Sequence, residues 1–112
     1  GTDLMLMEHE NCPCMETCPL NRAMALIGGK WKMQILCSLY NNGPTRYNQL
    51  KKTLDGVSNT VLANALRELE GDGLVHRQEY LEVPVRVEYA ITEPCRQLIP
   101  ILDALGDWSM AL

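Results

Sequence analysis

An alternating segment, VPVRVEYAI at residues 83–91, is the feature that most restricts how this chain can fold. Strict alternation of apolar and polar side chains predicts a half-buried β-strand. The preceding segment LVHRQEY, residues 74–80, is rich in strand-forming residues and lies close enough to pair with it as a hairpin around LEVP. The residues of the second strand expected to face the core are Val83, Val85, Val87, Tyr89 and Ile91.

A helix is predicted directly before this hairpin, over residues 58–71. Ser58 is a favourable N-cap, apolar residues recur at helical spacing, and GDG at 71–73 ends the helix. Its apolar positions are Val61, Leu62, Ala65, Leu66 and Leu69. After the hairpin, Thr92 can cap a last helix, which Pro100 should bend. The apolar stripe of this last helix comprises Leu98, Ile101, Leu102, Leu105, Trp108 and Leu112.

Three shorter amphipathic helices are predicted earlier in the chain. Pro19 begins the first and Gly28-Gly29 ends it, while NNGP at 41–44 stops the second. The segment RYNQLKKTL, residues 46–54, forms the third. Two short helices joined by a tight turn and followed by a β-hairpin make a winged helix-turn-helix. The 112 residues are therefore expected to form one α+β, mostly helical domain of this fold class.

The charged residues are distributed unevenly, although the net charge is −4. Residues 1–21 carry four acids and no Lys or Arg, whereas residues 22–55 carry six bases and one acid. A basic block inside an acidic chain is compatible with a local phosphate-binding surface. A solvated helix face would explain the same charges, so the charge pattern alone leaves both interpretations open.

The predicted helix 58–71 presents a small, polar face opposite its apolar stripe. Short side chains allow a helix to enter the major groove of DNA, which is about 12 Å wide. Asn can pair with adenine and Arg with guanine, while Ser and Thr can bond phosphates or base edges. The candidate DNA-binding residues on this face are Ser58, Asn59, Thr60, Ala63, Asn64 and Arg67. An ordinary solvated face is the alternative, and the hairpin directly after the helix favours DNA binding.

Basic residues outside this helix are further candidates for contact with DNA. Arg86 lies just past the predicted hairpin tip, where a wing could touch the backbone or the minor groove. Arg46, at the start of the third predicted helix, could hold a phosphate, and Lys51 and Lys52 could do the same. Each of these residues is also compatible with an ordinary surface charge.

Several motifs together resemble one known family. They are GGKW at 28–31, GPTRYNQL at 43–50, LRELEGDGLV at 66–75 and PVRVEYAIT at 84–92. In this combination the chain resembles the HxlR (DUF24) family of bacterial transcription regulators, which are similar to the MarR regulators. The resemblance extends over residues 18–108. One departure is Pro94-Cys95, which stands where many members carry a short glycine-containing turn.

The resemblance implies a sequence-specific DNA-binding regulator, usually a repressor, that binds a palindromic double-stranded operator as a homodimer. It also implies extra dimerisation helices at both ends of the winged helix-turn-helix. The expected parts are a flexible acidic arm (1–17) and an HxlR-type domain (18–112), with a recognition helix at about 58–71, a wing at about 74–91 and a dimerisation helix at about 93–112.

Cys18 is the candidate sensing residue. It stands immediately before Pro19, where the positive end of a helix can lower a thiol pKa below about 8.5. Arg22, four residues on, adds positive charge. An accessible thiolate of this kind suits sensing of oxidants or electrophiles, and many HxlR regulators carry a cysteine at the matching position. The alternative is that Cys18 packs as a small apolar residue.

The other cysteines are less constrained by the sequence. Cys12 and Cys14 are candidates for resolving an oxidised Cys18, or the C-x-C-x3-C spacing could hold zinc with His9 as a fourth ligand. Cys37 is expected in the core, and Cys95 remains open. We expect neither a metal nor another cofactor, because the spacing matches no standard zinc motif.

An enzyme is not expected from this sequence. It contains no glycine-rich phosphate loop, no nucleophile elbow, and only two histidines. The odd number of cysteines favours a reducing cytoplasm over a secreted disulfide scaffold, and no apolar run is long enough to span a membrane. Two alternatives remain beside a redox-sensing regulator, namely control by a ligand or zinc, and a winged helix that serves as a protein-interaction module.

Overall fold

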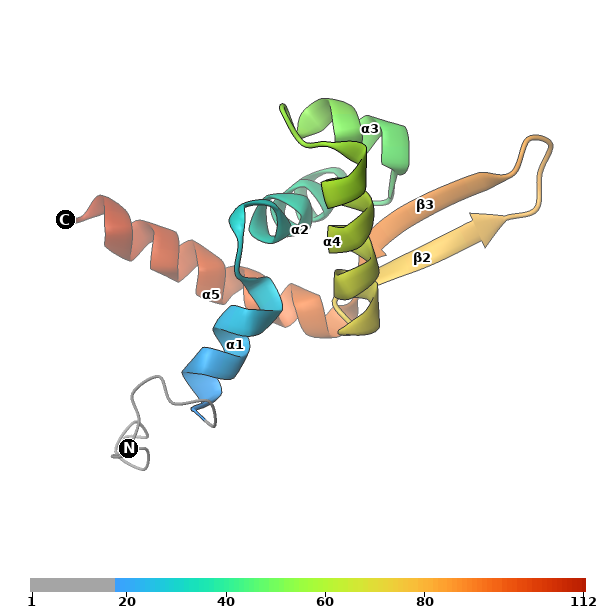
Figure 1. Ribbon diagram of the computed structural model, residues 1–112. Coiled ribbons are helices and arrows are strands. Elements are labelled where there is room, and N and C mark those ends of the chain that lie inside the picture. Colours follow the sequence, from blue (N-terminus) through green and yellow to red (C-terminus); the bar gives the residue numbers. More distant parts are fainter. Residues whose placement is uncertain (1–17) are drawn as a thin grey trace.

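The computed structural model describes residues 18–112, which fold as a winged helix with a long C-terminal helix (Figure 1). In chain order the elements are α1 (Pro19–Ile27), α2 (Lys30–Asn42), β1 (Thr45–Arg46), α3 (Tyr47–Thr53), α4 (Asn59–Gly71), β2 (Val75–Tyr80), β3 (Arg86–Ile91) and α5 (Glu93–Met110). The predicted fold class is confirmed. Among these helices, none combines the length and hydrophobicity that crossing a bilayer requires.

Two polar side chains begin the two helices that flank the hairpin. The Ser58 hydroxyl accepts a hydrogen bond of 3.1 Å from the Val61 amide at the start of α4. The Thr92 hydroxyl accepts one of 3.3 Å from the Cys95 amide at the start of α5. Both caps satisfy an amide that has no partner within its own helix, as the sequence predicted.

The junction between α1 and α2 depends on both of its glycines. A Cβ atom at Gly28 would collide with the backbone carbonyl of Met24. Gly29 has φ of 97°, a left-handed conformation that residues with side chains rarely adopt. The pair therefore lets the chain turn sharply from α1 into the helix that packs beneath α4.

The sheet contains a strand that the sequence pattern did not predict. The order is β1-β3-β2, with antiparallel pairs on both sides of β3. β1 consists of Thr45 and Arg46 alone and pairs with Tyr89 and Glu88. The prediction that Arg46 begins the third helix is therefore wrong by one residue, because a two-residue strand is too short to show any periodicity.

The hairpin begins its second strand later than predicted. The six-residue strands β2 and β3 pair from Val75 with Ile91 to Tyr80 with Arg86. Val83 and Val85 were expected to face the core but lie in the exposed connection between the strands. Pro84 has no amide hydrogen to contribute to a strand ladder. The alternation of apolar and polar residues therefore begins at Val83, before the first residue of β3 that pairs with β2.

The core lies where α2, α3 and α4 meet the base of the hairpin and the start of α5. Its buried members are Ile27, Ile35, Leu36, Leu39, Leu50, Leu54, Val57, Leu62, Ala65, Leu66, Leu69, Val75, Ile91 and Cys95. Two predictions about burial are wrong: Cys37 is exposed on α2 and Val61 is 42% exposed on α4. Each position lies at the edge of its helix's apolar face. A small rotation of the helix about its axis decides whether a side chain there is buried or exposed.

Only the first part of α5 packs against this core. Cys95 and Ile99 are buried, with Leu98 and Leu102 partly covered. Beyond them α5 extends away from the body of the molecule (Figure 1), and most of its predicted apolar stripe is exposed in the single chain. The helix runs continuously through Pro100.

Shortening Leu62 tests how far α4 depends on the core. Leu62 is 0% exposed, so Leu62→Ala leaves a cavity and should lower the free energy of unfolding by about 3 kcal/mol. Val61→Ala, one residue earlier and largely exposed, should lower it by less than about 1 kcal/mol. Urea denaturation followed by circular dichroism measures both. Equal effects of the two substitutions would contradict the burial of Leu62 and the exposure of Val61.

Candidate nucleic-acid interface

The polar face of α4 is exposed as the sequence predicted. Ser58, Asn59, Thr60, Asn64 and Arg67 are all exposed, and Ala63 is half-buried between them. The buried stripe of Leu62, Leu66 and Leu69 holds the opposite side of the helix against the core. Contact of these exposed residues with DNA stays a prediction.

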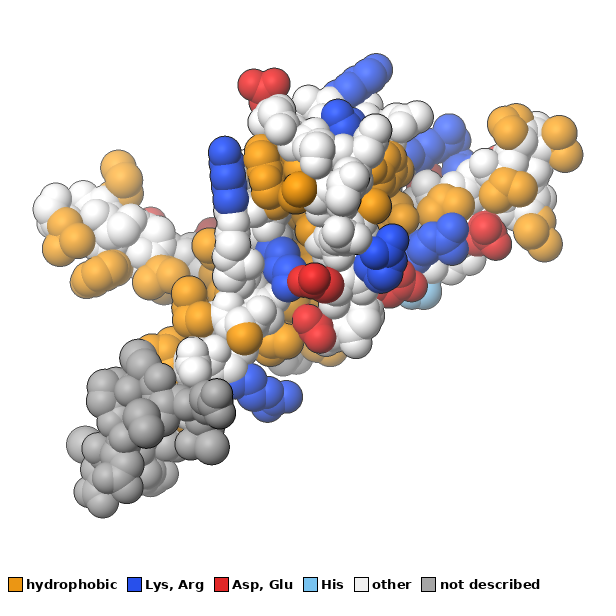
Figure 2. Space-filling model, viewed as in Figure 1, with side chains coloured by type: hydrophobic (Ala, Val, Ile, Leu, Met, Phe, Trp, Pro, Cys, Tyr) orange, Lys and Arg blue, Asp and Glu red, His pale blue; other side chains and the backbone are white. Residues whose placement is uncertain are grey.

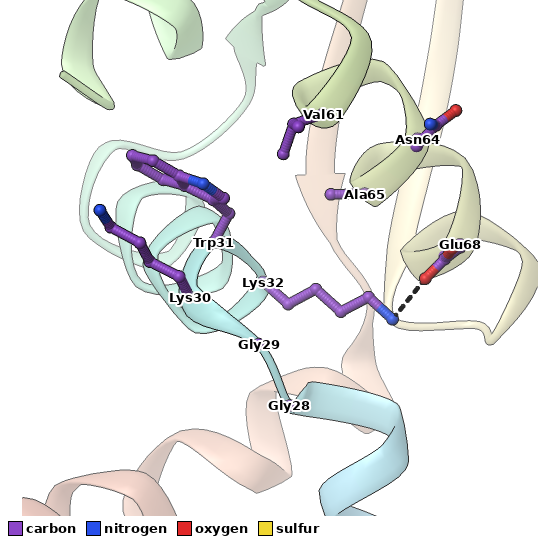
Figure 3. Close-up of a pocket in the computed structure, with 9 residues that line it drawn as sticks. All are labelled: Gly28, Gly29, Lys30, Trp31, Lys32, Val61, Asn64, Ala65 and Glu68. Atoms are coloured by element: carbon purple, nitrogen blue, oxygen red, sulfur yellow. Dashed lines mark ion pairs between the residues drawn. The ribbon is translucent and has the colours of Figure 1, made fainter. Parts of the chain in front are cut away.

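Two of these side chains already form a pair. Arg67 Nη1 donates a hydrogen bond of 2.7 Å to Asn64 Oδ1. Asn64 points away from α2 into the open (Figure 3), and its amide carries both a donor and an acceptor. The arginine therefore orients an amide that could pair with an adenine edge.

Tyr47 supports the start of α4 from α3. Its hydroxyl lies 3.1 Å from both the backbone oxygen and the side-chain oxygen of Asn59. Helical spacing marks Tyr47 as an inward residue, and it is half-buried, but its hydroxyl reaches the predicted DNA-binding face. No sequence signal connects these residues, because they lie twelve positions apart and on different helices.

Part of the basic block is neutralised within the fold. Lys32 Nζ lies 2.7 Å from Glu68 Oε1 and joins α2 to α4 (Figure 3). The bond from Lys32 lowers the pKa of Glu68 below its ordinary value of 4.5. The ion pair is therefore still present at pH 4.5, and it is lost only when the pH falls through the lowered pKa of Glu68. Lys32 is therefore a structural residue and does not contribute a free positive charge.

A hollow of about 250 Å³ lies beside this ion pair, between the start of α2 and α4 (Figure 3). Trp31, Val61 and Ala65 supply its apolar surface. The ammonium group of Lys30 lies 4.7 Å from the centre of the Trp31 ring, a cation–π contact. Lys30 is thus held at the α1–α2 junction.

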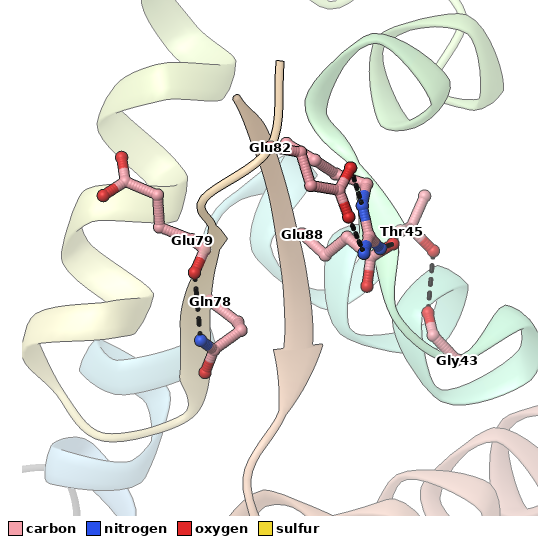
Figure 4. A network of polar contacts seen from close by, with 7 residues as sticks. Gly43, Thr45, Gln78, Glu79, Glu82 and Glu88 are labelled. Carbon is pink, nitrogen blue, oxygen red and sulfur yellow. Dashed lines mark hydrogen bonds and ion pairs between the residues drawn. The ribbon is translucent and has the colours of Figure 1, made fainter. Parts of the chain in front are cut away.

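Arg86, the predicted wing residue, is enclosed by carboxylates. Its guanidinium lies 2.8 Å from Glu82 and 2.7 Å from Glu88, two carboxylates that lie close together in Figure 4. It also stacks 3.8 Å from the centre of the Tyr80 ring. These bonds lower the pKa of Glu82 and raise that of Arg86 further. The structure therefore places Arg86 in an internal network, although the sequence suggested a free cation for the DNA backbone.

The remaining basic candidates occupy different surroundings. Arg46 is exposed and stands opposite Glu88 in the sheet, and its charge also lowers the pKa of Glu82. Lys52 is exposed and Lys51 is half-buried at the end of α3. Arg67 on α4 and Lys52 on α3 are thus exposed bases that form no ion pair with any of the described residues 18–112.

Comparison with known proteins places this geometry in one family. A family model described as HxlR-like helix-turn-helix matches residues 26–112. The chain belongs to the HxlR-like helix-turn-helix family. The predicted family is therefore confirmed, and the elements from α2 to α5, including α4, lie within the matched region.

Relatives of this HxlR-like chain are described as transcriptional regulators. An uncharacterised HTH-type transcriptional regulator, BH0655 of Halalkalibacterium halodurans, is 42% identical over 92 residues, which are 82% of this chain and 81% of that protein. Another, from Methanothermobacter thermautotrophicus, is 44% identical over 91 residues, which are 81% of this chain and 69% of that protein. The protein is a transcriptional regulator with a helix-turn-helix, and this family implies DNA binding.

Solved structures of two similar proteins, HypR and YodB, are described by their redox form or by treatment with diamide. The redox regulator HypR in its oxidised form has a TM-score of 0.77 and 37% identity, covering 85% of this chain and 97% of that one. The reduced form of YodB from Bacillus subtilis has a TM-score of 0.76 and 33% identity, covering 83% and 91%. A diamide-treated YodB structure is also similar, with a TM-score of 0.73.

The structure places Cys18 at the N-terminal end of α1. It is the N-cap residue, is 7% exposed and is joined in a disulfide. The expectation of an accessible thiolate is therefore wrong for this form of the protein, because the sulfur is both buried and oxidised. Cys12, Cys14 and His9 lie outside the described residues.

Cys37 and Cys95 are free thiols in contrasting surroundings. Cys37 is exposed on α2, and Cys95 is buried at the start of α5. Burial is the main cause that raises the pKa of Cys95, and the nearby Cys37 contributes in the same direction. Within residues 18–112 no three His, Cys, Asp or Glu side chains gather in a way that could hold a metal ion.

The contrast between these two thiols can be measured directly. Cys37 should react rapidly with iodoacetamide at mildly alkaline pH, whereas Cys95 should stay unmodified in the folded protein because it is both buried and protonated. Mass spectrometry of timed samples follows each site. In urea both should react at similar rates. Rapid modification of Cys95 in the native protein would contradict its described burial.

Proposed function

We propose that the protein binds a palindromic operator as a homodimer and represses transcription. The observation that carries this proposal is the exposed polar face of α4, oriented by Tyr47 and Arg67 and followed directly by the wing. Side chains of this size fit the major groove, and Asn and Arg can read adenine and guanine there. Such a regulator would act in the cytoplasm, together with the chromosome.

The exposed apolar residues at the two ends of the domain support a homodimer. Those on α1 are Leu20 and Met24, and those along the second half of α5 and just beyond it are Ile101, Leu105, Trp108, Met110 and Leu112. A protein that stays monomeric rarely exposes so many large apolar side chains together. Two copies paired through these helices would place two α4 helices on successive major grooves, about 34 Å apart.

Control by oxidation through Cys18 is the second part of the proposal. Cys18 begins α1, one of the two helices assigned to the dimer contact, and its sulfur is bonded in this structure. HypR, described as a redox regulator in oxidised and reduced forms, shares the fold at 36–37% identity. Opening or forming a bond at Cys18 would shift α1 and thereby change the spacing between the two α4 helices. A tenfold change in operator affinity needs only about 1.4 kcal/mol.

DNA binding and its sequence preference can be tested with one set of duplexes. Sequences enriched from a random duplex pool by the wild-type protein serve as the specific probe, and a mixed-sequence duplex serves as the non-specific one. Wild-type affinity should fall steeply with salt, by roughly 10³ from low to physiological ionic strength if six or more phosphates are contacted. Absence of any salt-dependent binding would refute the proposed function.

Removing the oriented amide should reduce specificity more than general affinity. Asn64→Ala is expected to weaken binding to the enriched duplex by about tenfold, since one base-reading pair contributes about 1–3 kcal/mol. Its affinity for the mixed-sequence duplex should stay unchanged. Fluorescence anisotropy measures both, and an equal loss on the two duplexes would assign Asn64 to backbone contact.

The sensing residue is tested by substitution under oxidant. Diamide should alter operator affinity of the reduced wild type by about tenfold or more, while Cys18→Ser should respond little, since it cannot form the bond. Cys37→Ser, which removes an exposed thiol elsewhere, is the matched control and should behave as wild type. An unchanged oxidant response in Cys18→Ser would exclude Cys18 as the sensor.

A further inference from the structure

We propose that the tip of the wing contacts DNA through apolar side chains and not through a cation. Leu81, Val83 and Val85 would enter the minor groove next to the major groove read by α4, while Arg86 positions this tip and neutralises its carboxylates. This inference rests on the proposed function, because it concerns the second contact of the same DNA-binding surface.

The tip exposes its apolar side chains to an unusual degree. Leu81 is 90% exposed, Val83 102% and Val85 56%. They lie in the connection between β2 and β3, at the end of the hairpin that projects from the domain (Figure 1), and hydrophobic side chains crowd this end (Figure 2). Large aliphatic groups are costly to leave in water, so a cluster of three at one tip indicates a contact surface.

The charges of the three-stranded sheet and of the connection between β2 and β3 cancel one another. The arginines are Arg46 on β1, Arg77 on β2 and Arg86 on β3, and the carboxylates are Glu79, Glu82 and Glu88. Arg86 bonds Glu82 and Glu88, Arg77 lies 3.7 Å from Glu79, and Arg46 stands opposite Glu88. As described, the sheet and its connection therefore offer no surplus positive charge to a phosphate.

A neutral, aliphatic tip matches the chemistry of the minor groove. That groove is about 6 Å wide, and proteins that enter it commonly insert aliphatic side chains against sugars and base steps. An uncompensated carboxylate there would be repelled by the surrounding phosphates. By bonding both Glu82 and Glu88 and stacking on Tyr80, Arg86 removes that repulsion and holds the strand ends that carry the tip.

The first experiment removes the apolar tip without altering charge. Leu81→Ser/Val83→Ser should bind the enriched duplex about tenfold more weakly, while the slope of affinity against salt stays unchanged because no phosphate contact is lost. The matched control Leu81→Met/Val83→Ile keeps the apolar surface and should bind as wild type. Thermal unfolding should be the same for all three proteins, since both positions are exposed.

Hydroxyl-radical footprinting locates the contact, because these radicals attack sugars from the minor groove. Wild-type protein should protect sugars flanking each half-site, and Leu81→Ser/Val83→Ser should lose that protection while keeping the protection over the half-site itself.

The second experiment separates positioning by Arg86 from direct phosphate contact. Arg86→Gln leaves both Glu82 and Glu88 unpaired and should weaken binding by about tenfold. Adding Glu82→Gln and Glu88→Gln to that variant should restore wild-type affinity if Arg86 acts by neutralisation, and should leave the affinity well below wild type if Arg86 binds phosphate itself. Restoration supports the proposal, and its absence overturns the role given to Arg86.

The outcomes distinguish this inference from the proposed function. If the wild type shows no salt-dependent binding to either duplex, the proposed function fails. If the wild type binds and Leu81→Ser/Val83→Ser binds equally well with an unchanged footprint, the wing tip does not enter DNA and this inference is overturned. A wing-variant loss accompanied by a shallower salt slope would also overturn it, because the contact would then be electrostatic.

Discussion

The exposed polar face of α4 depends on the burial of the opposite side of this helix against α2 and the base of the hairpin. Leu62 and Leu69 are fully excluded from solvent, and Leu66 nearly so. Because these three residues fix the rotation of the helix about its axis, they also decide which residues face outward. The polar face is thus a consequence of core packing, and its composition of short side chains decides what it can approach.

Electrostatics within the fold explains how an acidic chain can present a DNA-binding surface. Lys32 is paired with Glu68 and Arg86 with two glutamates, so several bases serve structure. The same pairs also mask carboxylates that would otherwise repel phosphate. Counting bases and acids along the chain therefore misjudges the surface, since the relevant quantity is the charge left after internal pairing.

The cysteines differ in chemistry because they occupy different layers of the fold. Cys95 is buried behind the cap of α5 and its thiol is held protonated, while Cys37 faces solvent. Cys18 is the N-cap of α1, a helix whose apolar residues Leu20 and Met24 are exposed in the single chain. Of these three cysteines, Cys18 alone lies beside the apolar face of α1 that is proposed to contact the second subunit. This location supports its proposed role in sensing.

The sequence by itself determined the types of the elements, most of their ends and the identity of the exposed residues on α4. These features follow from local periodicity, from caps at Ser58 and Thr92, and from the glycines that end α1, all of which act over a few residues. Only the tertiary structure decided that Arg86 is enclosed, that Tyr47 reaches Asn59, that β1 joins the sheet and that Cys37 is exposed. Each of these depends on contacts between separate elements or on the exact phase of a helix against the core. A pattern read along one segment carries no information about the partner that folding brings opposite it.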